Sequence, residues 1–295
     1  MNYTDYVAHR PRACISVVHR GIWRDAPENS LLAIERTIDA GHKVVEIDVR
    51  QTVDGNFVLL HDDTLERMTG VGRAPEELTS PEVAALRLRN RDGGSDNAAT
   101  QEKVASLGDV FDLTRDRLFI HLDVKTRDLI PAVKQYAREM RVLEQVDFWT
   151  NLQTAEDLQW VRSAVDPRDV LFMPKIRLNA ADAVRQVELA LQLGSSVFEI
   201  VYDSLDEIVA LRDRLEGTGI SIWCNTLDGV ACAGFTDTAA VERPEEIWGR
   251  LIDAGVSVIQ TDYADRLEAF VSSRPQNATP GRTHRTGPAP AGGVS

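Results

Sequence analysis

Short apolar runs alternate with helical patterns along most of the chain. The strand-like runs are residues 14–19, 43–49, 57–61, 118–124, 146–149, 170–173, 197–201, 221–224 and 256–261. Most are continuous apolar stretches, the pattern of strands that are buried on both faces of a parallel sheet. Helical patterns fit between most of them. Repeated strand–helix units in this number favour a parallel barrel or a doubly wound sheet.

The clearest helical pattern covers residues 29–40. It has apolar positions at Leu32, Ile34 and Ile38, and Gly41 follows as a stop signal. Similar patterns cover residues 154–164, 180–193, 204–215 and 244–254.

Three segments depart from a simple repeat. The stretch RQTVDGN after residue 49 is too short for a crossover helix, so nine strand candidates compete for eight places and this connection must be irregular. Residues 62–104 are polar and predict an insertion, with a helical piece near 80–88 and a flexible loop over 89–102. Residues 272–295 are rich in Pro, Gly, Ser and Thr and predict a disordered tail. Residues 1–271 are then expected to form a single domain.

The charge and cysteine content of the chain limit the kinds of molecule that it can be expected to bind. The 295 residues carry 46 acidic and 33 basic side chains, a formal net charge of −13. This balance argues against a nucleic-acid coat or an anionic membrane surface as partner, but it allows a phosphorylated substrate in a small basic or metal-loaded pocket. The three cysteines offer neither a disulfide framework nor a zinc pair. Without a signal-like or membrane-spanning run, a cytoplasmic protein is expected.

Polar residues cluster where the predicted strands end. These residues are His19, Arg20, Glu46, Asp48, His61, Asp62, Asp123 and Lys125, followed by Lys175, Glu199, Asn225 and Asp262. In a parallel barrel the carboxyl ends of the strands form the face on which active sites are built. Charges this close to buried strands are costly unless they are paired or bound to a metal.

The carboxylates suggest a site for a hard cation. Glu46 and Asp48 are two residues apart, so both side chains point to the same side of a strand. With Asp123 they offer oxygen-only ligation, which suits magnesium, calcium or manganese better than zinc. A structural ion-pair cluster with Arg20 and Lys125 is the alternative interpretation.

The remaining charged residues complete a set suited to phosphoryl transfer. His19 and His61 can act as a general acid–base pair. Arg20 and Lys125 can neutralise an anionic group.

In order along the chain, the motifs HRG, PEN, EID, HD and DVK resemble those of the glycerophosphodiester phosphodiesterase family. HDDTLERMTGVG, ASLGDVFDL, SIWCNTLDG and GVSVIQTDYADRLEAFV continue the resemblance, which covers residues 14–271. It implies a TIM (β/α)8 barrel that hydrolyses small phosphodiesters with one divalent cation. By position, His19 and His61 are the catalytic pair and Glu46 and Asp48 are metal ligands. Asp123, in DVK, stands where most of the family has its third metal ligand, a glutamate. The related sphingomyelinase D enzymes have aspartate at this position, so the resemblance is compatible with Asp123 as the third ligand.

The resemblance therefore implies a metal-dependent phosphoric diester hydrolase of lipid metabolism, which cleaves a glycerophosphodiester or a similar small phosphodiester to an alcohol and a phosphomonoester. Arg20, Lys125, Trp223 and Asn225 are the candidate phosphate- or substrate-binding residues, although Trp223 and Asn225 can equally pack. The nucleophile is either water or a vicinal hydroxyl that forms a cyclic phosphate, and either histidine can be the acid. A phospholipase D-like or cyclising lyase activity on lysophospholipids ranks second. A non-catalytic barrel that binds phosphate ligands is the third alternative.

Residues 62–104 and 228–244 are expected to choose the substrate, because both follow strand ends that carry site residues. The first segment contains five arginines, at positions 67, 73, 87, 89 and 91. They either meet an anionic leaving group or form a solvated face.

Overall fold

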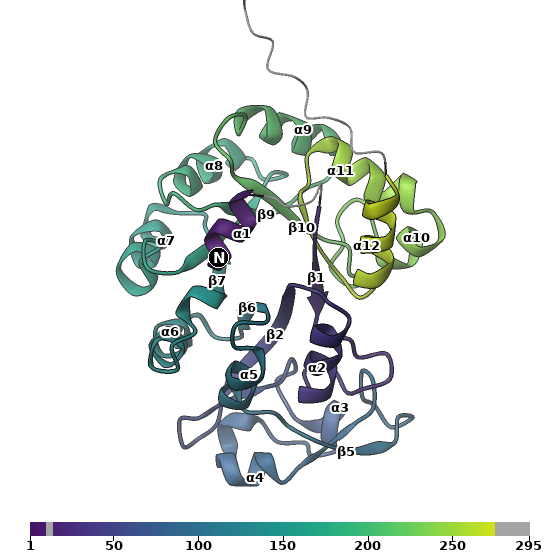
Figure 1. The fold of residues 1–295 in the computed structure, drawn as a ribbon. Coiled ribbons are helices and arrows are strands. Elements are labelled where there is room, and N and C mark those ends of the chain that lie inside the picture. Colours follow the sequence, from purple (N-terminus) through teal and green to yellow (C-terminus); the bar gives the residue numbers. More distant parts are fainter. Residues whose placement is uncertain (10–13, 275–295) are drawn as a thin grey trace, which may run out of the picture.

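The computed structural model describes residues 1–9 and 14–274. Their main feature is a closed barrel of eight parallel strands with helices around it (Figure 1). The barrel strands are β1 (Ile15–His19), β2 (Val44–Gln51), β6 (Phe119–Val124), β7 (Val146–Asn151), β8 (Leu171–Arg177), β9 (Val197–Val201), β10 (Ser221–Asn225) and β11 (Val258–Thr261). Pairing of β1 with both β11 and β2 closes the ring, so the predicted TIM barrel is confirmed.

The ninth strand candidate lies outside the parallel ring. Strand β3 (Phe57–Leu59) pairs antiparallel with the end of β2, so the short connection between them is a hairpin. The nine predicted strands are therefore the eight parallel strands of the barrel and one antiparallel strand outside it. A hairpin needs only a few residues, whereas a parallel crossover needs a dozen or more.

Helices follow the parallel strands in the order expected of the fold. They are α2 (Leu31–Asp39), α5 (Leu107–Thr114), α6 (Ile130–Glu139), α7 (Ala155–Trp160), α8 (Ala183–Leu191), α9 (Leu205–Arg214), α10 (Asp237–Glu242), α11 (Arg250–Ala254) and α12 (Ala264–Ser273). π-helical turns extend α7 over Val161–Val165 and precede α11 over Glu245–Gly249. The hydroxyl of Ser30 caps α2 by accepting from the backbone N–H of Ala33, a contact worth about 1 kcal/mol.

The insertion between β3 and α5 has its own small core. It contains α3 (Glu66–Thr69), α4 (Ser80–Ala84) and an antiparallel pair, β4 (Arg87–Arg89) with β5 (Ala99–Lys103). Its buried apolar residues Leu65, Met68, Leu78, Val83, Leu88 and Val104 pack with Val58 of β3 and with Leu60. The loop expected over residues 89–102 is thus partly strand, because residues from 99 onward pair with β4.

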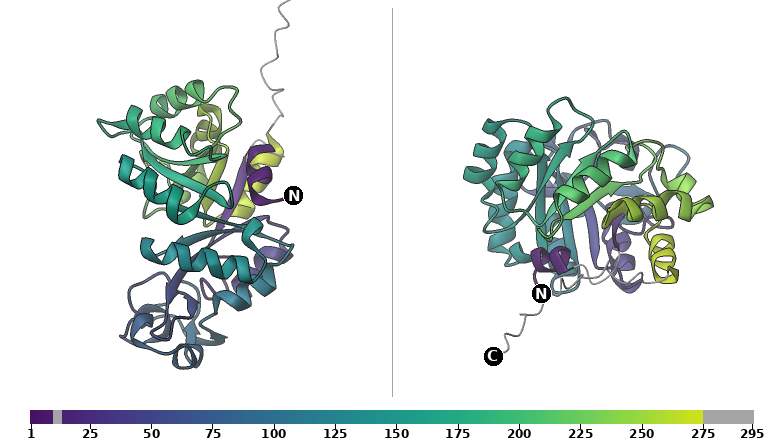
Figure 2. Two further views of the ribbon diagram at one scale, coloured as in Figure 1. Left: turned by 90° about the vertical axis from the view of Figure 1, so that its left-hand side faces the viewer. Right: turned by 90° about the horizontal axis from the view of Figure 1, so that it is seen from above.

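Helix α1 (Tyr3–His9) closes one end of the barrel, as Figures 1 and 2 show. Tyr3 and Val7 are buried, and Tyr3 stacks on Phe119 with ring centroids 4.9 Å apart. They join Val17, Met173, Trp223 and other inward-facing strand residues in one cluster. The sequence pattern did not predict this helix.

At the other end of the chain, α12 continues to Ser273. Arg274 then forms ion pairs with Glu245 and Asp253. The rest of the predicted tail, 275–295, lies outside the described residues. Every helix in the described ranges is too short or too polar to cross a membrane.

Candidate active site

Strand register brings the polar residues together at the carboxyl end of the barrel. His19 lies opposite Glu46 in the β1–β2 pair. Asp48 lies opposite Asp123 in the β2–β6 pair. Parallel strands that start in register therefore place these four side chains at one edge.

Glu46, Asp48 and Asp123 form the carboxylate cluster. One oxygen of each lies within 4.8 Å of one oxygen of the others. The Lys125 ammonium contacts two of them, at 2.5 Å from Asp48 Oδ1 and 2.6 Å from Asp123 Oδ2. Glu46 accepts a hydrogen bond from the backbone N–H of Arg20 and lies 3.9 Å from His19 Nε2.

Within the carboxylate cluster, the pKa values of Glu46 and Asp48 are shifted in opposite directions. Burial opposes ionisation of Asp48, but the charges of Arg20 and Lys125 outweigh it and lower the pKa of Asp48. Burial, followed by repulsion from Asp48, raises the pKa of Glu46. A buried carboxyl group with excess negative charge around it favours a bound cation. Three carboxylates with oxygen-only donors fit a divalent ion such as Mg²⁺, Ca²⁺ or Mn²⁺.

The HRG and PEN motifs fold against each other beside the carboxylate cluster. Arg20 and Asn29 both adopt positive φ, 55° each, which is uncommon outside glycine. The side chain of Asn29 donates to Asp48 Oδ2 at 2.7 Å and accepts from the backbone N–H of Asp48 at 3.1 Å. Arg20 pairs with Glu28 at 3.1 Å and with Asp48 at 3.0 Å. These contacts fix Asp48 from both sides.

His19 is held by a residue from the last strand–helix connection. Its Nδ1 lies 2.8 Å from Asp262 Oδ1, which also accepts from Trp23 Nε1 at 3.1 Å. Burial lowers the pKa of His19, but the hydrogen bond to Asp262 and the charge of Glu46 outweigh it, so the pKa is raised. With Nδ1 on a carboxylate, Nε2 is the nitrogen available for proton transfer.

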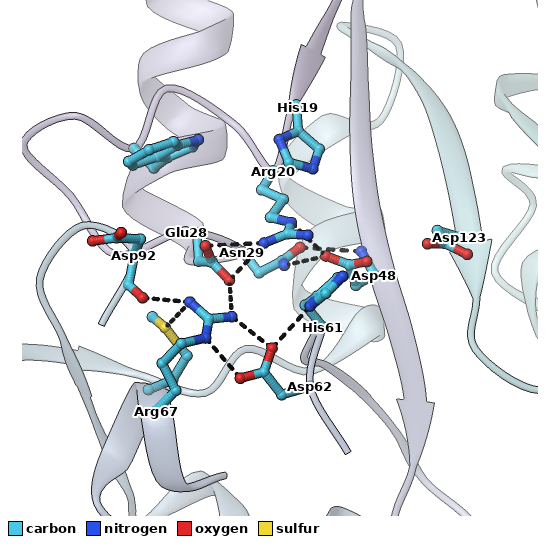
Figure 3. A network of polar contacts seen from close by, with 12 residues as sticks. His19, Arg20, Glu28, Asn29, Asp48, His61, Asp62, Arg67, Asp92 and Asp123 are labelled. Carbon is cyan, nitrogen blue, oxygen red and sulfur yellow. Dashed lines mark hydrogen bonds and ion pairs between the residues drawn. The ribbon is translucent and has the colours of Figure 1, made fainter. Parts of the chain in front are cut away.

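His61 is held in the same way by its neighbour. Its Nδ1 lies 2.8 Å from Asp62 Oδ1, and Arg67 donates to both oxygens of Asp62 (Figure 3). The side chain of His61 is 41% exposed, against 13% for His19. One histidine is therefore enclosed and the other lies at the mouth of the site.

A cavity of about 460 Å³ contains both histidines and the carboxylate cluster. Its far wall is formed by Trp149, Lys175, Glu199 and Asn225. Lys175 pairs with Glu199 at 2.8 Å and lies over the ring of Trp149. The rim includes Leu227, Asp228, Gly229 and Val230, and the side chain of Val230 is 60% exposed.

The four candidate substrate-binding residues occupy different places. Arg20 and Asn225 line the cavity. Lys125 lines an adjoining hollow that shares Asp123 and Trp149 with it. Trp223 is buried, donates from Nε1 to Asn225 Oδ1 at 2.8 Å, and is not among the described residues that line the cavity. The structure thus places Trp223 behind Asn225.

A buried histidine–aspartate pair also reaches the cavity, because His121 is one of its lining residues. His121 Nδ1 is 2.6 Å from Asp147 Oδ1, and the His121 ring packs on Trp223. Burial lowers the pKa of His121, but the charge of Asp147 outweighs this and raises it to about 9. His121 is thus a buried member of an ion pair.

Sequence reasoning noted Asp62 and Asp262 as strand-end residues without giving them a role. It also missed Trp23, Trp149 and the structural engagement of Arg67. The sequence offered one hint of these roles, which is proximity to a motif residue. Asp62 directly follows His61, and Trp23 lies two residues after the HRG motif.

Relatives that match the chain in sequence include the following two. An uncharacterized protein, YqiK, of Bacillus subtilis is 32% identical over 266 residues, which cover 86% of this chain and 97% of that protein. A glycerophosphodiester phosphodiesterase of Caldanaerobacter subterraneus subsp. tengcongensis is 30% identical over 137 residues, which cover 43% of this chain. The match spans about half of that relative, 55%. A family model described as a domain of unknown function matches residues 172–271.

Solved structures share the fold. A glycerophosphoryl diester phosphodiesterase of Parabacteroides distasonis has a TM-score of 0.72 at 22% identity, over 94% of this chain and 95% of that one. An Oleispira antarctica phosphodiesterase in complex with its product sn-glycerol-3-phosphate has a TM-score of 0.65 at 18% identity, over 90% and 99%.

Fold, ordered motifs and relatives agree on one class, the phosphodiesterase barrels. The chain belongs to the glycerophosphodiester phosphodiesterase family.

Proposed function

We propose that this protein hydrolyses a glycerophosphodiester, or a similar small phosphodiester, to an alcohol and a phosphomonoester. The observation that carries the proposal is the pairing of two histidines with separate carboxylates, in the cavity that also holds the carboxylate cluster. The name of the Caldanaerobacter relative and the product bound to the Oleispira enzyme support the same chemistry.

The proposed division of labour follows from the contacts. Asp262 and Asp62 accept hydrogen bonds from the Nδ1–H groups of His19 and His61, which leaves both Nε2 atoms to exchange protons with the substrate. One histidine takes a proton from the nucleophile, either water or a vicinal hydroxyl, and the other protonates the leaving alcohol. Arg20 and Lys125 offset the negative charge of the phosphate.

Glu46, Asp48 and Asp123 are the proposed ligands of one divalent cation. When bound, such a cation supplies Lewis-acid polarisation of a phosphate oxygen. Lys125 contacts two of the three ligands and keeps Asp48 and Asp123 together. The cytoplasmic location and the place in lipid metabolism remain sequence-based expectations within this proposal.

Metal dependence is tested with the intact protein and a panel of glycerophospho-alcohols. We expect EDTA to abolish turnover and Mg²⁺, Mn²⁺ or Ca²⁺ to restore it. Calorimetry should show weaker metal binding by Asp48→Ala, with Asp228→Asn as a matched control from the same cavity. Full turnover after removal of tightly bound metal would contradict the proposal.

A second candidate is a phospholipase D-like or cyclising activity on lysophospholipids. The observation in its favour is the apolar rim formed by Leu227 and Val230. Adding lysophospholipids to the panel separates the two, and ³¹P NMR distinguishes a cyclic phosphate from a monoester. Binding without turnover of any diester would instead support the non-catalytic barrel.

A further inference from the structure

Arg67 lies at the centre of a polar network that joins the insertion to the active site (Figure 3). It belongs to α3. Its Nε donates to Asp62 Oδ2 at 2.6 Å and its Nη2 to Asp62 Oδ1 at 2.8 Å. Nη2 also donates to Glu28 Oε1 at 2.7 Å. A planar guanidinium that grips one carboxylate with two donors fixes its orientation as well as its charge.

The first branch of the network leads to His61. Asp62 Oδ1 accepts from His61 Nδ1, and the hydrogen bonds from Arg67 lower the pKa of Asp62 to about 2. An ionised carboxylate only accepts hydrogen bonds, so it keeps the proton on Nδ1 of the neutral ring. Arg67 thereby sets the tautomer of His61 through Asp62.

The second branch leads to Arg20. Glu28 is 3% exposed and lies between two guanidinium groups, since Arg20 Nη1 is 3.1 Å from both of its oxygens. Arg20 in turn pairs with Asp48. Removing one cation from a buried carboxylate leaves charge that is poorly compensated.

The insertion also holds Arg67 itself. Its Nη1 donates to the carbonyl of Asp92, and its own carbonyl accepts from the backbone N–H of Gly94 at 2.7 Å. Gly93 has φ of +74°, and a Cβ there would lie 2.5 Å from the Arg67 carbonyl oxygen. This loop therefore requires glycine to approach Arg67 so closely.

We infer that Arg67 is a positioning residue of the reaction, which holds His61 through Asp62 and Arg20 through Glu28. The inference rests on the proposed function. It replaces the expectation that Arg67 meets an anionic leaving group, because Nε, Nη1 and Nη2 are all engaged and Arg67 is not among the described residues lining the cavity. The insertion thus contributes to the chemistry as well as to the shape of the mouth.

The kinetic test compares Arg67→Met and Arg67→Lys with Arg73→Met. Arg73 lies in the same insertion, its side chain donates to the carbonyl of Glu77, and it is not among the described residues that line the cavity. We expect kcat to fall about 10–100-fold in Arg67→Met, the range typical when a partner of a site residue is lost, with KM little changed. Arg67→Lys keeps the charge but not the two-donor grip, so its loss should be smaller. Arg73→Met should resemble the wild type.

A double-mutant cycle separates positioning from general damage to the fold. If Arg67 acts through His61, Arg67→Met should cost far less in a His61→Ala background than in the wild type. Equal losses of kcat in both backgrounds would overturn the inference.

A readout without turnover keeps the inference separate from the proposed function. In ¹⁵N NMR spectra, His61 of the wild type should carry its proton on Nδ1, and this preference should weaken in Arg67→Met and Arg67→Lys. His42, which pairs with Asp265 and Glu268, serves as the unchanged control. An unaltered His61 tautomer in both variants would refute positioning. Absence of wild-type turnover would refute the proposed function alone.

Discussion

The two histidines of the site differ in how they are held. His19 is enclosed and its carboxylate partner comes from the far end of the chain, 243 residues away. His61 is half-exposed and its partner is the next residue. This asymmetry suits two steps of different character, one inside the cavity and one at its mouth.

We predict that His19→Ala and His61→Ala each lower kcat by about 100-fold or more, because general acid–base groups contribute about 10²–10⁴. The double variant should be far less than multiplicatively worse if the two act as a unit. Steady-state rates on the preferred diester, with circular dichroism as the check on folding, provide the measurement. His42→Gln is the control, and a folded single variant with near wild-type rate would remove that histidine from the mechanism.

Sequence alone could predict that the residues of the candidate site lie together, but not which partners hold them. Glu46, Asp48 and Asp123 were predicted as a set because alternation along a strand and the shared edge of a parallel sheet are properties of the backbone. The contacts of Asp262 with His19 and of Arg67 with Glu28 depend on how distant loops fold over the barrel. No local pattern encodes those distances.

At the scale of elements, the apolar runs predicted the nine strands of the main sheet but not β4 and β5 of the insertion, and the direction of β3 needed the pairing itself. Helix α1 escaped detection because seven residues form too short a helix to be stable alone. Its stability comes from the burial of Tyr3 and Val7 against the barrel.

Helix α12 contacts the barrel through His42, which lies in the loop between α2 and β2. His42 is buried, with Nε2 2.8 Å from Asp265 and Nδ1 3.0 Å from Glu268. Burial favours the neutral ring, but the hydrogen bonds to Glu268 and Asp265 outweigh it and raise the pKa of His42.

The raised pKa makes part of the stability depend on pH. The contribution of protonated His42 is fully present below its unfolded pKa, about 6.5, and is lost as pH rises through the higher folded value. We predict that the difference in unfolding free energy between wild type and His42→Gln shrinks over that interval. Urea unfolding at a series of pH values measures it. A difference that stays constant with pH would show that His42 contributes by packing only.

The segment 228–244 supports the site as well as bordering it. Asp237, at the start of α10, accepts hydrogen bonds from the hydroxyls of Thr226 and Thr261 and from the backbone N–H of Asp262. It therefore braces the residue that holds His19. That residues 228–244 determine substrate specificity stays a prediction, which rests on the position of Val230 and its neighbours at the rim of the cavity.

The loop of the insertion is open to a direct test. Replacing residues 90–101 with a short Gly/Ser link should change the ranking of substrates, or KM, more than it changes metal affinity. Because the loop contacts Arg67 and the backbone N–H of Glu28, we now also expect kcat to fall for every substrate. A Gly/Ser replacement of residues 216–219 is the control. Unchanged ranking, KM and kcat would exclude the loop from both roles.

At the scale of the whole molecule, the barrel is functional at one end and sealed at the other. Polar groups occupy the carboxyl ends of the strands, while α1 covers the inner apolar cluster at the opposite end. The described fold thus separates the surface that carries the chemistry from the surface that carries stability, as in other barrels of this type.

We predict that Tyr3→Ala lowers the free energy of unfolding by about 3–5 kcal/mol, the usual cost of truncating a buried aromatic residue. Tyr3 is only 1% exposed and stacks on Phe119. Urea unfolding measures the change, and Val53→Ala, at a residue that is 62% exposed, is the control. A loss no larger than that of the control would mean that α1 is dispensable for stability.

The separate core of the insertion determines how this barrel can be recombined with the barrels of its relatives. The insertion, residues 62–104, is contiguous in sequence and follows the short strand β3. It could therefore be exchanged as one segment with the insertion of a relative. Arg67 makes that exchange conditional, because its second carboxylate, Glu28, is encoded ahead of the insertion in the PEN motif. A chimera that replaces residues 62–104 must therefore carry an arginine at this position or also redesign the loop after β1. Swaps that ignore the pairing should yield folded but slow enzymes.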